Sequence, residues 1–231
     1  MRYKHLFFDL DHTLWDFEAN SEETLRDVFQ EYDLSARGIP DFSAFHRIYV
    51  GHNERMWERF RKGFINREEL RWKRVWHTLL EFKINDQQLV QDISGRYLEI
   101  LPTKTHLFPD TREVLEYLKA KAYPMHLITN GFERTQHLKI THSGIRAYFD
   151  HIVTSESAGS LKPHPAIFTF ALQQTGCLPA EALMIGDTLE VDILGARNAG
   201  INQVYFNPAK PAQGIQPTYS IRTLSELKEI L

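Results

Sequence analysis

The sequence is poor in cysteine, in long apolar runs and in clusters of basic residues. Cys177 is the single cysteine among 231 residues, which excludes an internal disulfide and a metal site built from cysteines. No apolar run reaches the roughly 18 residues that a membrane-spanning helix requires, so we expect no membrane partner. Basic residues form no compact block and the net charge is −3, so we expect no nucleic-acid polymer as a partner. These absences predict a soluble, cytoplasmic protein.

The residues that are abundant are those that build a folded core. Hydrophobic residues make up 42% of the chain, aromatic residues 12% and charged residues 25%, which is a globular composition. At roughly 100–200 residues per domain, the length allows one large domain or two unequal ones. We expect a monomer or a small homo-oligomer.

Hydrophobic periodicity divides the chain into two kinds of structure. Residues 5–10 form a continuous apolar segment, typical of a strand buried in a parallel sheet. Residues 17–103 then show four helical patterns separated by turn signals, which predicts a small helical bundle. After residue 103, strands alternate with helices, which indicates parallel βαβ units. We therefore predict an α/β fold in which a helical domain, 17–103, interrupts a core formed by 1–16 and 104–231.

The elements expected in the second half of the chain are short. The strands are predicted at 126–128, 151–153, 183–185 and, as the final strand, 203–206. Helices are predicted at 110–121, 133–143, from 165, at 190–199 and from 223. Asp110 is expected to cap the first of these helices, and Pro165 to open the third.

Two carboxylates follow the first predicted strand. Asp9 and Asp11 are two positions apart, and strand alternation would send both side chains to the same side, at the edge where open α/β sheets bind ligands. Closely spaced carboxylates at the end of an apolar strand are costly unless a cation or a proton is shared there. The plainer interpretation is a pair of loop acids that cap the next segment.

Three more polar groups follow later strands. Thr129-Asn130-Gly131 precedes a helix and offers a hydroxyl and backbone N–H groups to an anion, although an ordinary turn has the same sequence. Lys162 precedes a proline that favours extended backbone, and its ammonium could reach the sheet edge or remain on the surface. Asp187 and Asp192 follow another strand, and Asp192 also suits the first turn of a helix.

The order of these motifs resembles the haloacid dehalogenase (HAD) superfamily. The chain has Asp9-x-Asp-x-Thr13, Thr129-Asn-Gly, Lys162-Pro and Gly-Asp187-x₄-Asp192, each after a predicted strand. The Gln at position 136 and the Ile-Leu-Gly after Asp192 narrow the resemblance to the YjjG-type bacterial pyrimidine 5′-nucleotidases. It implies a Rossmann-like core with a helical C1-type cap. His12 departs from the pattern, because many members of the superfamily have glycine there.

The resemblance implies a magnesium-dependent phosphatase. Asp9 would attack phosphorus and form an aspartyl-phosphate, and Asp11 would serve as general acid and then general base. The Mg²⁺ ligands would be Asp9, the backbone carbonyl of Asp11, and Asp187, because Mg²⁺ prefers oxygen ligands. Asp192 and Thr13 would support these residues.

The same resemblance assigns phosphate oxygens to Thr129, the backbone of Asn130, and Lys162. Asn53 and Arg74 are the polar residues that we expect to contact the rest of a nucleotide, with Trp15, Phe17 and Trp57 as aromatic candidates. The alternative is that most of these aromatic residues belong to the bundle core.

Several other functions share parts of this pattern. A sugar-phosphate phosphatase or a phosphomutase of the same superfamily would keep all four motifs and differ in the cap. A dehalogenase would not need the acidic set of Asp11, Asp187 and Asp192. A phospho-accepting signalling or binding module uses Asp, Thr and Lys around Mg²⁺ but is about half this length and carries its acceptor on a later strand. The small phosphorylated substrate that we expect is a pyrimidine nucleoside monophosphate.

Overall fold

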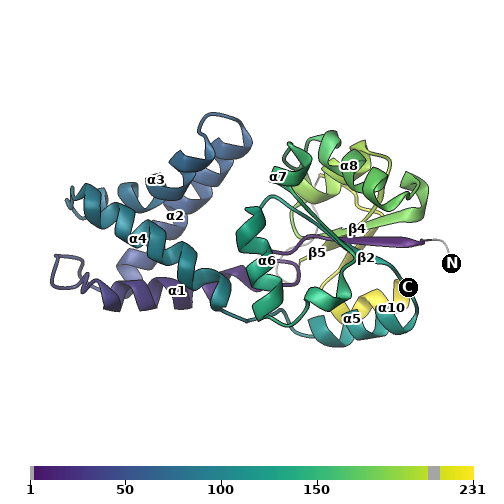
Figure 1. Ribbon diagram of the computed structural model, residues 1–231, viewed down its shortest axis with the longest axis horizontal. Helices are drawn as coiled ribbons and strands as arrows, with labels where there is room; N and C mark the ends of the chain where they lie inside the picture. Colours follow the sequence, from purple (N-terminus) through teal and green to yellow (C-terminus); the bar gives the residue numbers. More distant parts are fainter. Residues whose placement is uncertain (1–2, 208–213) are drawn as a thin grey trace. The chain divides into compact units, whose positions relative to one another are not determined.

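The computed structural model describes residues 3–207 and 214–231, and the chain divides into two compact units (Figure 1). One unit comprises Met1–Phe17 and Thr105–Leu231 and is called here the sheet unit. The other comprises Glu18–Lys104 and is called the helical unit. No helix among the described residues is both long enough and apolar enough to cross a membrane.

The sheet unit is built on one sheet of parallel strands in the order β3-β2-β1-β4-β5-β6. The strands are β1 (His5–Phe8), β2 (Met125–Thr129), β3 (His151–Thr154), β4 (Ala182–Gly186), β5 (Asn202–Phe206) and β6 (Tyr219–Ile221). β2 and β4 are buried along their whole length, as parallel strands covered on both faces should be.

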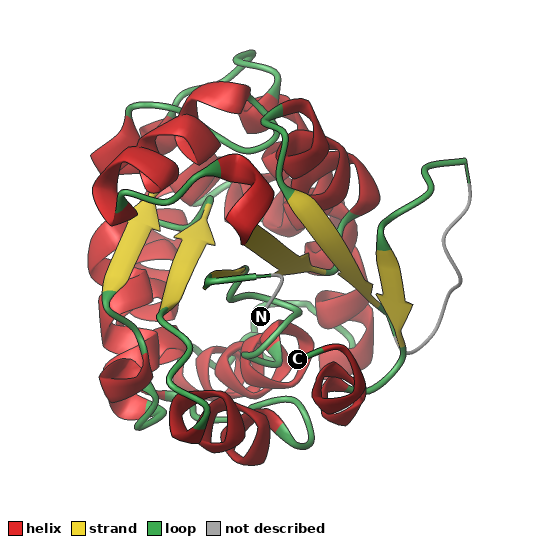
Figure 2. Cartoon of the chain, turned by 90° about the vertical axis from the view of Figure 1, so that its right-hand side faces the viewer, coloured by secondary structure: helices red, strands yellow, loops and turns green. Residues whose placement is uncertain are grey.

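Helices cover the two faces of this sheet (Figures 1 and 2). They are α5 (Thr111–Ala120), α6 (Glu133–His142), α7 (Ser155–Ala158), α8 (Pro165–Thr175), α9 (Leu194–Asn198) and α10 (Leu227–Ile230). On the α8 face, Phe168 is fully buried in an apolar cluster with Phe7 and Ile128. A π-helical turn, Leu189–Ile193, leads from β4 into α9.

The helical unit contains α1 (Phe17–Glu31), α2 (Phe42–Arg61), α3 (Arg67–Glu81) and α4 (Gln87–Ile100). Asp41, Asn66 and Asp86 accept hydrogen bonds from backbone N–H groups at the starts of α2, α3 and α4, which fixes where these helices begin. The buried faces of these helices carry the core residues Leu25, Phe45, Tyr49, Val75, Leu79, Ile93 and Tyr97.

The predicted fold class is confirmed, with three local differences. β1 ends at Phe8 and not at Leu10, and β6 is a strand that was not predicted. Asp110 stands at the start of α5, but its φ of 65° is left-handed and its side chain makes no capping hydrogen bond. The prediction that it caps the helix is therefore wrong.

Candidate active site

The candidate site lies where the order of the sheet reverses. From β1 the chain proceeds to β2 and β3 on one side, and β4, β5 and β6 lie on the other. Ligands of open α/β sheets bind at the carboxyl ends of the strands at this point. Asp9 directly follows β1 and Asp187 directly follows β4, so both lie at this edge.

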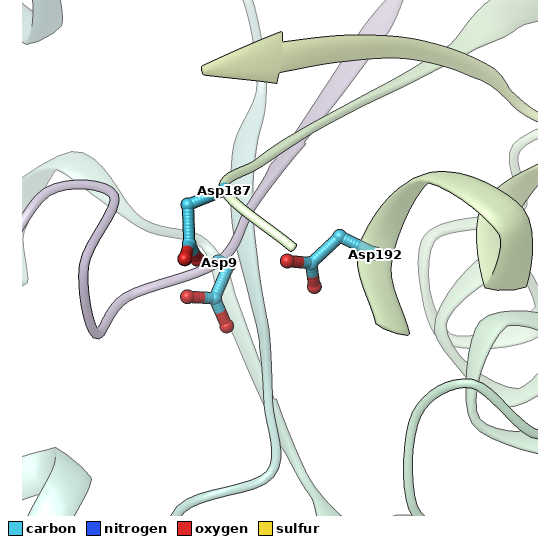
Figure 3. A group of neighbouring side chains, drawn as sticks. All are labelled: Asp9, Asp187 and Asp192. Carbon is cyan, nitrogen blue, oxygen red and sulfur yellow. The ribbon is translucent and has the colours of Figure 1, made fainter. Parts of the chain in front are cut away.

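Three carboxylates, those of Asp9, Asp187 and Asp192, lie close together (Figure 3). One oxygen from each of Asp9, Asp187 and Asp192 lies within 4.8 Å of the others. The Lys162 Nζ, 1% exposed as a residue, donates to Asp9 Oδ1 and, at 2.7 Å, to Asp192 Oδ1. Asp192 Oδ2 accepts from the backbone N–H of Thr188 at 3.0 Å, so both of its oxygens are engaged by the protein.

A glycine makes room for this arrangement. A Cβ atom at Gly186 would lie 2.5 Å from the Cβ of Asp192, which is closer than real Cβ contacts. The glycine that ends β4 therefore lets the Asp192 side chain pack against the strand end, beside Asp9 and Lys162.

The pKa values of Asp9 and Asp187 reflect their burial and the negative charges beside them. Burial raises the pKa of Asp9 to about 8; Lys162 opposes this rise, while Asp192 and Asp187 add to it. Burial, followed by the charge of Asp192, raises the pKa of Asp187 to about 7. Burial alone would lower the pKa of Lys162, but the charges of Asp192 and Asp9 outweigh it and raise that pKa. A further cation would relieve the crowding of the carboxylates.

The chemistry of this group fits magnesium. Mg²⁺ takes oxygen ligands, usually one or two carboxylates together with water and substrate phosphate. Asp9 and Asp187 each have an oxygen that no lysine engages, whereas Asp192 is occupied by Lys162 and Thr188. The residues present therefore fit a divalent cation held by Asp9 and Asp187, with Asp192 holding the lysine.

Thr129, at the end of β2, has a hydroxyl proton to give. Its Oγ1 accepts from the backbone N–H of Gly131 at 3.0 Å and from Nε2 of Gln136 at 2.6 Å. Because no acceptor for the Thr129 proton lies among the described residues, the hydroxyl is ready to donate to an anion.

Asn130 fixes the position of Lys162. Its side-chain amide donates to the Lys162 carbonyl at 2.9 Å and accepts from the Lys162 N–H at 2.7 Å. This reciprocal pair joins the loop after β2 to the segment before α8. The Asn130 side chain is thereby engaged, which leaves its backbone for any contact with a ligand.

Asp11 contacts a different set of residues from Asp9. Lys139 donates to Asp11 Oδ1 at 2.5 Å, and Gln136 donates to Asp11 Oδ2 at 2.9 Å. Because β1 already ends at Phe8, strand alternation does not place the two carboxylates, and the predicted reason for their orientation is wrong.

Comparison with known proteins decides the family. Residues 3–200 match the haloacid dehalogenase-like hydrolases. The chain belongs to this family. It is 30% identical to pyrimidine 5′-nucleotidase PynA of Streptococcus pneumoniae and 30% identical to pyrimidine 5′-nucleotidase YjjG of Escherichia coli. Both alignments cover 100% of this chain, with 96% of PynA and 99% of YjjG. The resemblance identified from the motifs is confirmed.

Similarity to a solved structure supports the same family. The hydrolase-family protein YfnB of Bacillus subtilis, in a structure bound to magnesium, has 29% identity and a TM-score of 0.90, over 100% of this chain and 99% of that one. The chain is also 29% identical to the glyceraldehyde 3-phosphate phosphatase of Pyrococcus furiosus, over 100% of this chain and 93% of that protein. The relatives of this hydrolase therefore include enzymes named for nucleotides and enzymes named for sugar phosphates.

Within the first motif of this HAD-family hydrolase, His12 and Thr13 contribute to the conformation of the loop after β1. His12 has φ of 65°, a conformation that glycine adopts without strain, which accounts for the glycine found there in many members. Its ring contacts that of Phe17, with centroids 5.0 Å apart. Thr13 is fully buried, and its hydroxyl lies 3.4 Å from Asp187 Oδ1.

The helical unit holds the two polar residues predicted to contact substrate. Arg74 is 4% exposed and donates to Asn53 Oδ1 at 3.0 Å, and its guanidinium lies over the Tyr97 ring at 5.0 Å. The predicted aromatic candidates differ: Trp15 is fully buried in the sheet unit and donates to Ser143 at 3.2 Å, whereas Trp57 is half-buried on α2.

Gln136 and Lys139 are the site residues whose positions the sequence pattern did not supply. Gln136 belongs to the family resemblance, and no motif of the sequence points to Lys139. A lysine on a helix at the surface of a domain ordinarily lies in solvent, but Lys139 is 3% exposed. The available signal was its spacing, because it follows Gln136 by three positions on one helix face.

Proposed function

We propose that this hydrolase is a magnesium-dependent phosphatase that cleaves phosphomonoesters through an aspartyl-phosphate, with pyrimidine nucleoside monophosphates as its preferred substrates. The observation that carries the proposal is the buried Asp9 carboxylate, which lies beside Asp187, Asp192 and Lys162 at the switch point of the sheet. We further propose that it acts in the cytoplasm.

Asp9 is the nucleophile in this mechanism. Its carboxylate oxygen forms a bond to phosphorus as the bond from phosphorus to the leaving oxygen breaks, and water later cleaves the acyl phosphate. Mg²⁺, held by Asp9, the backbone carbonyl of Asp11, and Asp187, would neutralise charge between the carboxylate and the phosphate. Lys162 keeps Asp9 in place, and Asp192 and Thr13 hold Lys162 and Asp187.

The remaining steps use Asp11 and the loop after β2. Asp11 gives a proton to the leaving oxygen and later takes one from the attacking water. Thr129 donates its free proton to a phosphate oxygen, and the Asn130 backbone and the Lys162 ammonium contribute to the same charge. The preference for nucleotides is supported by the relatives PynA and YjjG.

Asn53 and Arg74 are proposed to contact the part of the substrate beyond the phosphate. Asn53 Oδ1 accepts from Arg74, so its Nδ2 and the remaining guanidinium N–H groups are the atoms left to donate. The Arg74 Nε is buried and has no hydrogen-bond partner among the described residues. A set composed only of donors suits a group rich in acceptors, such as the carbonyl oxygens of a pyrimidine base.

The alternative is a phosphatase for small sugar phosphates, which the similarity to glyceraldehyde 3-phosphate phosphatase favours. The deciding experiment measures inorganic phosphate release with Mg²⁺ from nucleoside monophosphates, triose and hexose phosphates, and nitrophenyl phosphate. We expect the highest kcat/KM for UMP, dUMP or dTMP. A sugar phosphate cleaved with a higher kcat/KM than any nucleotide would replace the nucleotidase proposal, and no release from any ester would overturn the phosphatase.

A further inference from the structure

Helix α6 presents two buried polar side chains to the same carboxylate. Gln136 and Lys139 are three positions apart, so they lie on one face of the helix, and they are 0% and 3% exposed. Between them they donate to both oxygens of Asp11, Lys139 to Oδ1 and Gln136 to Oδ2. The Asp11 carboxylate is thereby fixed at both ends by one rigid element.

The ammonium of Lys139 lies on an aromatic surface. Its Nζ is 4.2 Å from the centre of the Trp15 ring and 5.4 Å from that of Phe17. The Trp15 indole is itself anchored by its N–H bond to Ser143. Burial of an ammonium group costs several kcal/mol unless an opposite charge meets it, and Lys139 forms an ion pair with Asp11.

Gln136 joins Asp11 to Thr129. Its Nε2 donates to Asp11 at 2.9 Å and to Thr129 at 2.6 Å, which uses both amide protons. Because ionised Asp11 only accepts, this contact sets the orientation of the amide. The Gln136 Oε1 is left buried with no hydrogen-bond partner among the described residues, at a cost of about 1–3 kcal/mol.

The backbone beside Gln136 is adapted to this contact. A Cβ atom at Gly131 would lie 2.1 Å from the Gln136 Nε2, so a larger residue would expel the amide from its position. The glycine of the Thr129-Asn130-Gly131 motif thus has a second use besides the turn. It lets a side chain of α6 reach both Thr129 and Asp11.

We propose that Lys139 and Gln136 are positioning residues for Asp11. Lys139 holds the carboxylate that carries out proton transfer and stabilises its negative charge after the proton has gone to the leaving oxygen. Gln136 holds the same carboxylate at a fixed place relative to Thr129, and so relative to the phosphate. This inference rests on the proposed function of Asp11 as general acid and base.

The first test replaces Lys139 by methionine, which keeps the length of the side chain and removes the charge. If Lys139 acts through Asp11, the loss of kcat in Lys139→Met is up to about 100-fold for a poor leaving group such as a nucleoside, and at least tenfold smaller for nitrophenol. Lys139→Arg, which keeps the charge, restores part of kcat. An equal loss for both leaving groups would show a merely structural lysine and would overturn the proposal.

The second test is a double-mutant cycle. In an Asp11→Asn background, Lys139→Met lowers kcat by less than about twofold, because the group it positions is already gone. A loss as large as in the parent enzyme would refute the coupling. Should Lys139→Met fail to fold, as judged by circular dichroism, Gln136→Met takes its place in the same cycle, with an added rise in KM through Thr129.

Lys119→Met is the matched control. Lys119 also lies over an aromatic ring, 5.4 Å from the centre of Tyr148, but it is an exposed residue of α5. Its replacement leaves kcat unchanged. An unmutated enzyme that releases phosphate from no ester would refute the proposed function itself, whereas an active enzyme indifferent to Lys139→Met and Gln136→Met would refute only the positioning role.

Discussion

The two units differ in the buried charge that each leaves without full compensation. In the sheet unit, the carboxylates of Asp9, Asp187 and Asp192 lie close together, and the ammonium of Lys162 pairs with those of Asp9 and Asp192. In the helical unit, the Arg74 guanidinium is buried beside an amide and an aromatic ring, without an ion pair to any described carboxylate. The acidic cluster therefore holds more carboxylates than ammonium groups. The buried Arg74 Nε has no hydrogen-bond partner among the described residues.

Each unit therefore contains a buried charged group that lacks a different kind of interaction partner. Buried charges without full compensation cost several kcal/mol, so structures retain them chiefly where a ligand supplies what is missing. For the acidic cluster the missing partner is a cation. For Arg74 it is a group that accepts hydrogen bonds, as we propose for the substrate.

The largest effect is expected from removing one charge of the acidic cluster. Asp9→Asn keeps the shape of the side chain but removes the nucleophile, so kcat for every phosphomonoester should fall by at least about 10⁴-fold. Steady-state phosphate release measures this, with circular dichroism to verify folding. Substantial turnover by folded, undeamidated Asp9→Asn protein would contradict the assignment of the nucleophile.

The second prediction concerns Mg²⁺, the cation that we propose for the acidic cluster. Chelation should reduce phosphatase activity to background, and Mg²⁺ should restore it. Because a ligand that binds only the folded state stabilises it by about 2.7 kcal/mol at 100 times its Kd, Mg²⁺ should also raise the Tm. Asp187→Asn should abolish that rise. Full activity after exhaustive chelation would argue against a metal at this site.

A smaller effect is expected from giving Arg74 the carboxylate that it lacks. Asn53→Asp would pair with the guanidinium, so the Tm should stay equal or rise while KM for nucleotides increases about tenfold, a loss of about 1.4 kcal/mol of binding. The loss of kcat/KM should be at least threefold greater for nucleotides than for nitrophenyl phosphate. Arg71→Gln, at an exposed pair with Glu68, is the control on the same helix. An equal loss for both substrates would contradict contact with the base or the sugar.

The last prediction concerns stability and not activity, and it rests on a buried histidine, His126, that carries no charge. His126, on β2, is 2% exposed and lies 3.0 Å from His5 Nδ1 through its Nε2, while its Nδ1 has no hydrogen-bond partner among the described residues. Burial, with the neighbouring His5 and His151 adding to the effect, lowers the pKa of His126 to about 3. The imidazole is therefore neutral in the folded protein at neutral pH.

The sign of the resulting pH dependence follows from that lowered pKa. Above about pH 6.5, the ordinary pKa of histidine, His126 is neutral in both states and contributes no slope. Below it, the unfolded chain binds a proton that the folded chain does not, so the free energy of unfolding falls, by at most about 1.4 kcal/mol per pH unit, down to about pH 3. Urea unfolding at several pH values measures this slope, and His126→Leu should reduce it. An unchanged slope would contradict the assignment.

Much of this arrangement could be predicted because parallel strands end at one edge. Polar residues at the ends of apolar strands then lie at the same edge, as Asp9, Thr129 and Asp187 do, and the carboxylates of Asp9 and Asp187 come close together. The helical unit was also predictable from its apolar spacing.

The rest depends on tertiary contacts that no local pattern encodes. Lys139 is charged and helical, so its sequence context indicates solvent, and only the fold brings it to Asp11. The side-chain pairing of Asn130 with the Lys162 backbone likewise joins residues 32 positions apart. The final strand, β6, is short and only partly buried, which gives it too weak a hydrophobic pattern to be identified.

The position of β1 in the sheet also determines the order in which the active site is assembled during synthesis. β1 is made first, but its neighbours in the sheet are β2, where Leu6 pairs with Met125, and β4, where His5 pairs with Ala182. All residues of the helical unit, which ends at Lys104, are translated before those of either neighbouring strand. Asp9 is therefore among the earliest residues of the site to be translated. It can lie beside Asp187 only after most of the chain has been translated.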